Sequence, residues 1–334
     1  MAAMVARVPT TILTGPLGAG KSTAVLHLLR TRGDGRWAVL VNEMGDVGID
    51  AVIAKSATDD AVAEVAGGCV CCANGLAVTV SMTRLLRRRP TRLIIEPSGL
   101  GHVAELADAL TRPPLAGAVD LRAVLCVVPC DRHAELWSLS DAYRAMVHAS
   151  DALILNRRDV DAALTAAADR WAREEVYPRK AVALADRGRF DTSLLDSVRD
   201  APPPPLPAAW DESDAAVETT TRPSGAARIT SKRNGYAFLG FTFPTDHEPC
   251  DGAALDAALA TARAVPGAER IKGVFRTTHG WSLAQWVAGD GAVQRAPIAR
   301  APDSRIQLIL RGDLPPPATI DAVEACLCDA LSLW

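Results

Sequence analysis

Gly15-Pro16-Leu17-Gly18-Ala19-Gly20-Lys21-Ser22 fits the phosphate-binding loop pattern G-x-x-x-x-G-K-[ST]. The residues on either side predict matching secondary structure, with a short strand over Pro9–Thr14 and a helix over Lys21–Thr31. In such a unit, backbone N–H groups surround the phosphates and the helix N-terminus adds partial positive charge. We therefore interpret this stretch as a phosphate-binding loop rather than as an ordinary glycine-rich turn.

The side chains of this loop have distinct expected roles. Lys21 is a catalytic candidate, since it is placed to reach the β- and γ-phosphates of a nucleotide. The Ser22 hydroxyl is a candidate ligand for Mg²⁺. The predicted nucleotide contacts in the loop are Gly15, Gly18, Ala19, Gly20, Lys21, Ser22 and Thr23.

Short apolar runs alternate with helical patterns in the first part of the chain. The expected strands are Pro9–Thr14, Ala38–Asn42, Arg92–Glu96, Ala123–Val128, Ala152–Asn156 and Lys180–Ala183. The expected helices are Lys21–Thr31, Gly75–Arg88, His102–Leu110 and Ala162–Glu175. This alternation predicts an α/β P-loop NTPase fold, a mostly parallel sheet with helices on both faces. Ligands of such sheets bind beyond the carboxyl ends of the strands.

A proline-rich stretch interrupts this alternation at residues 202–207 and favours extended structure. We expect a P-loop domain over residues 1–201, a Pro-rich and polar linker over 202–235, and a small α+β domain over 236–334. The elements expected in the last range are strands at Tyr236–Phe243, Arg270–Arg276, Trp281–Val287 and Arg305–Leu310, and helices at Asp251–Ala264 and Ala318–Leu331.

An acidic loop, Asn42–Asp50, follows the second expected strand. Its carboxylates can contact Mg²⁺, a transition metal or a γ-phosphate. We select Asp46 as a catalytic candidate and Glu43 as a candidate metal ligand. Considered alone, the same residues are also compatible with a solvated acidic loop.

Glu96 ends an apolar strand, where nucleotide hydrolases keep the carboxylate that faces Mg²⁺ and its water shell. It is a catalytic candidate. Because Glu is longer than the usual Asp, we expect its contact with the cation to run through water. The alternative is a charge at the strand end that points to solvent.

The segment Asn156-Arg157-Arg158-Asp159 resembles the guanine-recognition motif N-K-x-D. In that motif the Asp accepts two hydrogen bonds from guanine, which adenine cannot supply. Arg157 replaces the Lys and can still lie flat over a base, but the residues leave its effect on guanine specificity open. The predicted contacts are Asn156, Arg157 and Asp159, the last of which could instead cap a following helix.

Three cysteines, Cys69, Cys71 and Cys72, follow a pair of glycines in the segment Gly67–Cys72. Their thiolates can converge on one soft metal ion, and glycines allow the backbone to turn tightly. This spacing leaves the ligand shell incomplete, which suits a site that gives its metal up. The alternatives are a buried apolar cluster and a thiol redox switch.

Composition narrows the class of protein. The net charge of −3 over 334 residues gives no indication of a nucleic-acid or membrane surface. No apolar run reaches the roughly 18 residues of a membrane span, and the N-terminus does not resemble a secretion signal. We expect a cytoplasmic protein, in which the eight cysteines are free thiols or metal ligands.

Taken together, the motifs resemble the CobW family of P-loop GTPases, which includes zinc chaperones, nitrile hydratase activators and cobalamin-biosynthesis proteins and is related to HypB and UreG. The residues that carry the resemblance are Gly15–Ser22, Asn42–Asp50, Glu64, Gly67–Cys72, Glu96–Gly99, Asn156–Asp159 and, more weakly, Arg270–Gly273. Asp46 departs from the family, which usually has Glu there, and the histidine-rich loop of many members is absent.

This resemblance implies a GTPase that uses GTP and Mg²⁺, binds zinc, or else cobalt or iron, at the cysteine motif, and delivers the metal to a client protein. Glu43 would belong to its switch loop. No arginine finger is identifiable, so slow intrinsic hydrolysis is expected. A homodimer is compatible with the chain. Two alternatives stay open, a P-loop kinase acting on a small molecule and a thiol redox-regulated nucleotide-binding protein.

Overall fold

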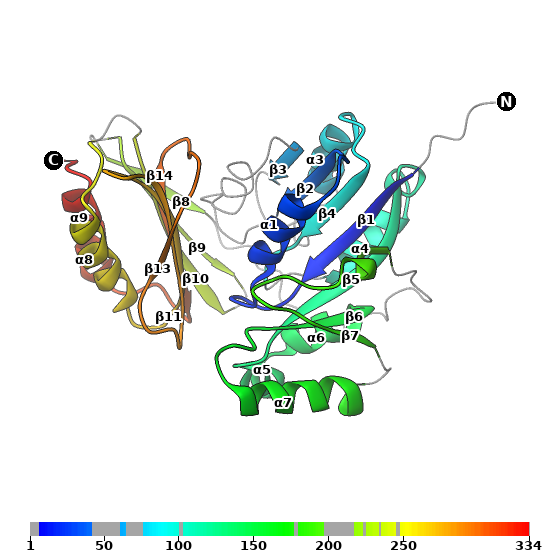
Figure 1. Ribbon diagram of the computed structural model, residues 1–334. Coiled ribbons are helices and arrows are strands. Elements are labelled where there is room, and N and C mark those ends of the chain that lie inside the picture. Colours follow the sequence, from blue (N-terminus) through cyan, green and yellow to red (C-terminus); the bar gives the residue numbers. More distant parts are fainter. Residues whose placement is uncertain are drawn as a thin grey trace. The chain divides into compact units, whose positions relative to one another are not determined.

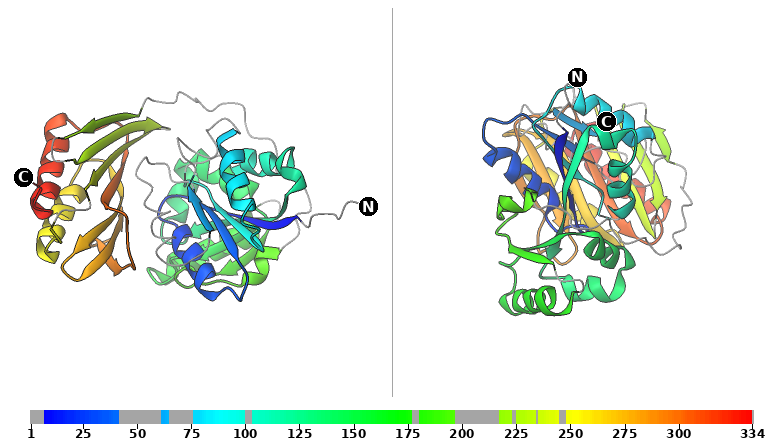
Figure 2. Two further views of the ribbon diagram at one scale, coloured as in Figure 1. Left: turned by 90° about the horizontal axis from the view of Figure 1, so that it is seen from above. Right: turned by 90° about the vertical axis from the view of Figure 1, so that its right-hand side faces the viewer.

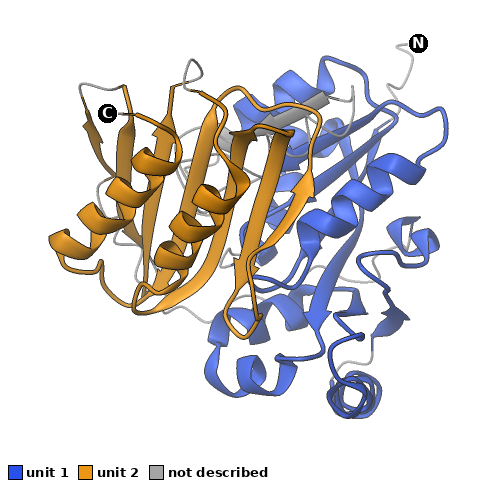
Figure 3. Cartoon of the chain, turned by 60° about the vertical axis from the view of Figure 1, so that its left-hand side comes forward, with its two compact units in different colours: residues 1–44, 58–210 blue, residues 45–57, 211–334 orange. Residues whose placement is uncertain are grey.

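The computed structural model describes residues 7–41, 61–64, 76–99, 103–176, 180–196, 217–222, 225–233, 235–244 and 248–333. The described residues up to Asp196 belong to one compact unit, and those from Val217 onward belong to a second (Figure 3). Each unit has its own sheet and its own hydrophobic core.

The described part of the first unit is built on a parallel sheet of seven strands in the order β3-β2-β4-β1-β5-β6-β7 (Figure 1). The strands are β1 Val8–Thr14, β2 Trp37–Val41, β3 Ala61–Glu64, β4 Arg92–Glu96, β5 Val119–Pro129, β6 Ala152–Asn156 and β7 Ala181–Leu184. The central strands are runs of apolar residues because both faces of the sheet are covered. All carboxyl ends therefore lie along one edge.

Helices cover both faces of this sheet. On one face, α3 (Leu76–Leu86), α4 (Val103–Thr111), α6 (Asp141–Ala149) and α7 (Ala162–Arg170) join a core cluster that includes Ile12 of β1. The other face receives α1 (Lys21–Thr31), which contacts β1 and β4. A further helix, α5 (His133–Leu139), follows β5. The expected P-loop architecture is confirmed by this arrangement.

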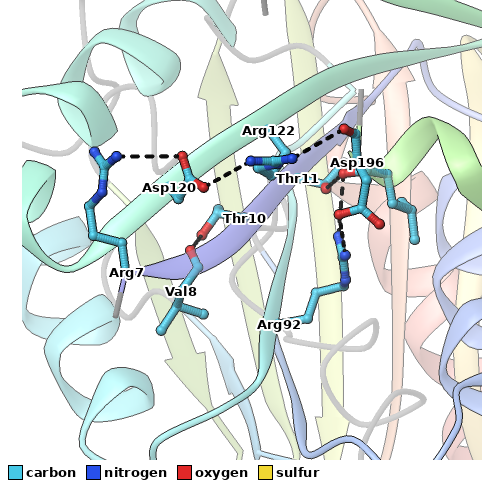
Figure 4. Close-up of polar contacts among 9 residues, drawn as sticks. Arg7, Val8, Thr10, Thr11, Arg92, Asp120, Arg122 and Asp196 are labelled. Carbon is cyan, nitrogen blue, oxygen red and sulfur yellow. Dashed lines mark hydrogen bonds and ion pairs between the residues drawn. The ribbon is translucent and has the colours of Figure 1, made fainter. Parts of the chain in front are cut away.

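A short helical turn, η3 (Thr192–Asp196), is anchored on the α1 face near the start of the central strands. The Thr11 hydroxyl donates to the backbone oxygen of Leu195 at 3.0 Å, and Arg92 forms an ion pair with Asp196 (Figure 4). These bonds join three strands of the sheet to the last described segment of the unit, since Arg122 of β5 also donates to the Asp196 backbone.

The second unit contains an antiparallel sheet in the order β13-β12-β11-β14-β10-β9-β8. Its strands are β8 Glu218–Thr221, β9 Ala227–Arg233, β10 Tyr236–Phe243, β11 Ala268–Thr277, β12 Gly280–Val287, β13 Gln294–Pro297 and β14 Ser304–Arg311. Helices α8 (Gly252–Arg263) and α9 (Pro317–Ala330) lie side by side on one face (Figure 2). Alternate residues of β10, such as Phe241 and Phe243, point to them and form the core.

Most expected elements are present, and most of their ends are shifted by at most two residues. The exceptions are β5, which begins four residues early at Val119, and α7, which ends at Arg170 and continues as a π-helical turn, η2 (Trp171–Glu175). The structure adds β3, α5, α6 and β13, which the sequence analysis did not predict. It also places β8 and β9 inside the range 202–235, which was expected to be a linker. The residues of β8 are polar and exposed, so no apolar alternation marks them, and pairing with β9 decides their conformation.

Within the described segments, no helix is both long enough and apolar enough to cross a membrane.

Candidate functional site

The loop between β1 and α1 is held in a conformation that requires glycine. Gly15 has φ +142°, and a Cβ placed on it would lie 2.4 Å from the backbone oxygen of Val127. Gly20 has φ +96°, and its Cβ would lie 2.3 Å from the Asn156 side-chain nitrogen. Both positions combine left-handed backbone with close approach of a neighbouring strand end. The pattern of glycines in residues 15–22 therefore has a structural cause in this fold.

Lys21 opens α1, and its side chain turns back across the loop. Its Nζ donates to the backbone oxygens of Gly15 at 2.8 Å and Pro16 at 3.2 Å. The residue is only 7% exposed although it carries a charge. This conformation keeps the ammonium group at the mouth of the loop, where it can reach an anion that the loop N–H groups bind.

Ser22, in the first turn of α1, contacts Glu96 at the end of β4. The Ser22 hydroxyl donates to Glu96 Oε1 at 2.9 Å. Glu96 ends β4, which pairs with β1, and it is 4% exposed, so it does not point freely to solvent. A hydroxyl and a carboxylate are oxygen donors of the kind Mg²⁺ prefers. The donor set at this point fits Mg²⁺ with Ser22 as the ligand and Glu96 behind it.

Asn156 at the end of β6 connects three loops. Its Nδ2 donates to the backbone oxygen of Ala19 at 2.8 Å, and its Oδ1 accepts from the backbone N–H of Gly188 at 3.2 Å. Gly188 follows β7 and packs against the start of α1, where a Cβ would lie 2.8 Å from the Ala24 nitrogen. The buried amide thus joins the glycine-rich loop to the loops after β6 and β7.

The other two predicted contacts of the base motif, Arg157 and Asp159, have different surroundings. Arg157 has φ +58° and donates from Nε to Asp131 Oδ2 at 2.8 Å. Asp159 is exposed in a turn. It does not cap α7, because Asp161 is the N-cap and accepts from the Leu164 N–H at 2.9 Å. The helix-cap alternative for Asp159 is therefore wrong.

No motif in the sequence marks the loop that follows β5 as part of the site. Asp131 of this loop binds Arg157, and the next residue, Arg132, donates from Nη2 to the backbone oxygen of Leu17 at 2.8 Å. Gly99 after β4 also approaches the glycine-rich loop, since its Cβ would lie 2.7 Å from the Leu17 nitrogen. Their only signal in the sequence is a position directly after an apolar strand.

The structure therefore brings Lys21, Ser22, Glu96 and Asn156 together at the carboxyl edge of the sheet. Several other candidates lie outside the described residues, namely Glu43, Asp46, Cys69, Cys71 and Cys72. Among the residues that are described, no group of three or more His, Cys, Asp or Glu side chains could hold a metal ion. Cys126, one of the described cysteines, is buried, and burial raises the pKa of its thiol to about 12.

Comparison with known proteins gives matches over both parts of the chain. The nucleotide-binding domain described as CobW/HypB/UreG matches residues 9–182. The zinc chaperone YeiR of Escherichia coli is 35% identical over 311 residues, which are 90% of this chain and 92% of YeiR. The zinc chaperone CobW of a Sinorhizobium species is 36% identical over 129 residues, or 36% of each protein.

Among solved structures, Zn(II)-bound YjiA GTPase from E. coli is similar over 98% of this chain and 99% of its own. The sequence identity is 18% and the TM-score 0.44, a likeness too distant to carry functional information.

Proposed function

The chain belongs to the CobW/HypB/UreG family of P-loop GTPases, and we propose that it is a GTP-dependent metallochaperone. In this proposal it binds a transition metal, zinc in the first place, at the C-x-C-C motif and transfers it to a client protein. Metal release is coupled to hydrolysis of GTP to GDP and phosphate.

The observation that carries the nucleotide part is the convergence of four side chains at one edge of the sheet. Lys21 lies across the glycine-rich loop, Ser22 is bound by Glu96, and Asn156 is bound to the loop backbone. This arrangement supports a triphosphate beside the loop and a base near Asn156. Asp159, exposed after β6, is available to accept hydrogen bonds from guanine.

Hydrolysis in this site is attack of water on the γ-phosphorus with cleavage of the bond to the β–γ bridging oxygen. Lys21 binds the β- and γ-phosphate oxygens and stabilises charge that develops there. Mg²⁺, when bound at Ser22, supplies further neutralisation of the phosphates. Glu96 holds the Ser22 hydroxyl in place, as its 2.9 Å hydrogen bond indicates.

The metal part rests on the chemistry of the cysteine motif and on the path of the chain. Thiolates are ligands for zinc and other soft ions. β3 ends at Glu64, shortly before Cys69 in the sequence. Glu64 is in register with Val41 of β2, which is in turn in register with Glu96 of β4. The chain therefore leaves the sheet toward the cysteine segment at the edge that carries Lys21 and Ser22, which supports coupling of the two sites.

The coupling is tested by zinc titration of the protein loaded with GDP or with a non-hydrolysable GTP analogue. If the γ-phosphate orders the metal site, zinc affinity should be about 5- to 150-fold higher with the analogue, and zinc should tighten the analogue by the same factor. Equal zinc affinities in the two states would overturn the coupling.

Elemental analysis of the protein purified without oxygen tests the metal site itself. Cys71→Ser should reduce bound metal, because it replaces a thiolate by a weakly acidic hydroxyl. The matched control is Cys326→Ser on α9, a partly exposed cysteine outside the motif. If both variants retained the wild-type metal content, the metal site would lie elsewhere.

A further inference from the structure

An ion pair lies just beyond the ends of two neighbouring strands in the nucleotide site. β5 and β6 are parallel partners, with Pro129 in register with Asn156. The Cys130 N–H donates to the backbone oxygen of Asn156 at 2.9 Å. One step further, Asp131 Oδ2 accepts from Arg157 Nε at 2.8 Å. The pairing of β5 with β6 thus continues up to this ion pair and sets the distance between Asp131 and Arg157.

Burial makes the loss of one partner of this pair more costly than in a surface pair. The Asp131 side chain is 8% exposed and that of Arg157 is 22% exposed. Asp131 Oδ1 is buried and has no hydrogen-bond partner among the described residues. Arg157 therefore compensates this buried carboxylate, and removing Arg157 leaves the Asp131 charge with little water around it.

Arg157 also has a backbone conformation that needs support. Its φ of +58° lies in the left-handed region, which residues with a Cβ rarely adopt. Such conformations persist where surrounding contacts determine them, and they concentrate at functional sites. Here the side-chain hydrogen bond of Asn156 holds the residue before Arg157 in place, and Asp131 holds the Arg157 side chain.

We propose that Asp131 is a positioning residue of the nucleotide site, which holds the Arg157 guanidinium in place over the base and thereby strengthens binding of the base. This rests on the proposed function, since it assumes that GTP binds beside Asn156. A planar guanidinium stacks on a base only when its plane is set, and a carboxylate that binds Nε sets it. Asp131 itself acts through Arg157.

The test compares Asp131→Asn with wild type in binding of Mg²⁺ with GDP, ADP or inorganic tripolyphosphate. Asp131→Asn keeps an acceptor oxygen but removes the negative charge that holds Arg157, so GDP should bind about tenfold more weakly, and ADP should be weakened by a similar factor because either base can stack. Tripolyphosphate has no base, so its affinity should not change. The matched control is Asp120→Asn, which breaks the Asp120–Arg122 pair at the other end of β5 and should behave as wild type.

Two further variants keep the test decisive. In an Arg157→Ala background, Asp131→Asn should add no further loss of GDP affinity, because its effect runs through Arg157. Arg157→Lys keeps the charge that Asp131 needs but removes the plane that stacks on the base, so it should weaken GDP and leave tripolyphosphate unchanged, even if Asp131→Asn does not fold.

The inference fails if Asp131→Asn weakens tripolyphosphate as much as GDP, if it leaves GDP unchanged, or if Arg157→Lys leaves the affinity for GDP unchanged. These failures are distinct from failure of the proposed function, which would be a wild-type protein that does not prefer GDP to ADP.

Discussion

Lys21 and Ser22 are neighbours in sequence, yet their side chains have different kinds of partner. The Lys21 ammonium binds neutral backbone oxygens of its own loop, whereas Ser22 binds the carboxylate of Glu96. A phosphate oxygen carries negative charge, so it attracts the ammonium group more strongly than a neutral carbonyl oxygen does. Exchange of the loop carbonyls for phosphate oxygens is therefore favourable, while the Ser22–Glu96 bond orients the hydroxyl before the cation arrives.

Ser22→Ala is expected to abolish the contribution of Mg²⁺ to GTP binding. With the hydroxyl gone, the cation loses a ligand, and the Mg²⁺-dependent gain in GTP affinity should fall at least roughly tenfold. Affinity measured in EDTA should match wild type. The control is Ser138→Ala, which removes an exposed hydroxyl that binds the Glu135 oxygen. An unchanged gain from Mg²⁺ would contradict the assignment of Ser22.

Gly20→Ala is expected to destabilise the protein before any ligand is added. The new Cβ would lie 2.3 Å from the Asn156 amide nitrogen, and φ +96° is strained for alanine. A cost of about 2 kcal/mol lowers the Tm by roughly 4–8 °C. Gly33→Ala is the control, since nothing lies within 4 Å of its Cβ. Thermal unfolding followed by circular dichroism measures both, and equal Tm values would refute the prediction.

Helices α5 and α6 and the π-helical turn after α7 meet in a cluster of aromatic rings. The His133 ring lies 3.8 Å from the Trp171 ring, measured between centroids, and its Nδ1 is 3.3 Å from the Tyr143 hydroxyl. Burial lowers the pKa of His133 from 6.5 to about 4. The cluster therefore depends on a neutral imidazole.

This gives the first unit a predicted pH dependence. The unfolded chain binds a proton at His133 near pH 6.5, and the folded chain binds it only near pH 4. Stability is thus full above pH 6.5 and is lost as the pH falls toward 4, by about 3 kcal/mol in total. His133→Phe should remove this part of the pH dependence in urea unfolding at pH 5 and pH 7.5. An identical pH dependence in variant and wild type would contradict it.

Strands β8 and β9 of the second unit are tied to α9 through Glu324. Arg222 donates to both carboxylate oxygens, at 2.9 and 3.0 Å, and Arg228 also binds Oε2. Burial alone raises the pKa of Glu324, but the hydrogen bonds and charges of the two arginines outweigh it and lower the pKa below 4.5. The stabilisation is therefore complete above about pH 4.5 and is lost at lower pH.

Glu324→Gln should lower the free energy of unfolding of the second unit by about 2 kcal/mol, because it removes a charge from a carboxylate that is 7% exposed. Glu269→Gln is the matched control, since its partner Arg311 is 53% exposed and such pairs contribute less than about 1 kcal/mol. Urea unfolding at pH 7 compares the two. A smaller loss for Glu324→Gln than for the control would show that the pair does not stabilise the unit.

The division of the chain into two units predicts where it can be cut. A fragment of residues 217–334 keeps β8 and β9, whereas one of residues 236–334 exposes the edge of β10 and deprives Glu324 of both arginines. The longer fragment should unfold cooperatively and the shorter one should aggregate or unfold without a clear transition. Size-exclusion chromatography and thermal unfolding test this, and equal behaviour would place the boundary at residue 236.

Local signals were sufficient for much of the first unit. The glycine pattern, the apolar runs and the helical periodicity predicted α1 at Lys21–Thr31 and β4 at Arg92–Glu96 with the observed bounds. They also placed Ser22 in the phosphate loop and Glu96 at the end of a strand, and the structure shows that the strands before these residues, β1 and β4, are neighbours and that the two side chains are hydrogen-bonded. These predictions succeeded because consecutive residues carry both the motif and the secondary structure.

Other features depend on contacts between distant parts of the chain. β8 is polar throughout and is a strand because β9 pairs with it. Asp131 belongs to no motif, and its partner Arg157 comes close because β5 and β6 are neighbours in the sheet.

The amino-acid order was therefore enough to establish a phosphate loop, its flanking elements and the family. The tertiary structure decided which side chains form ion pairs and hydrogen bonds with one another, because pairing of strands brings together residues that no local pattern connects.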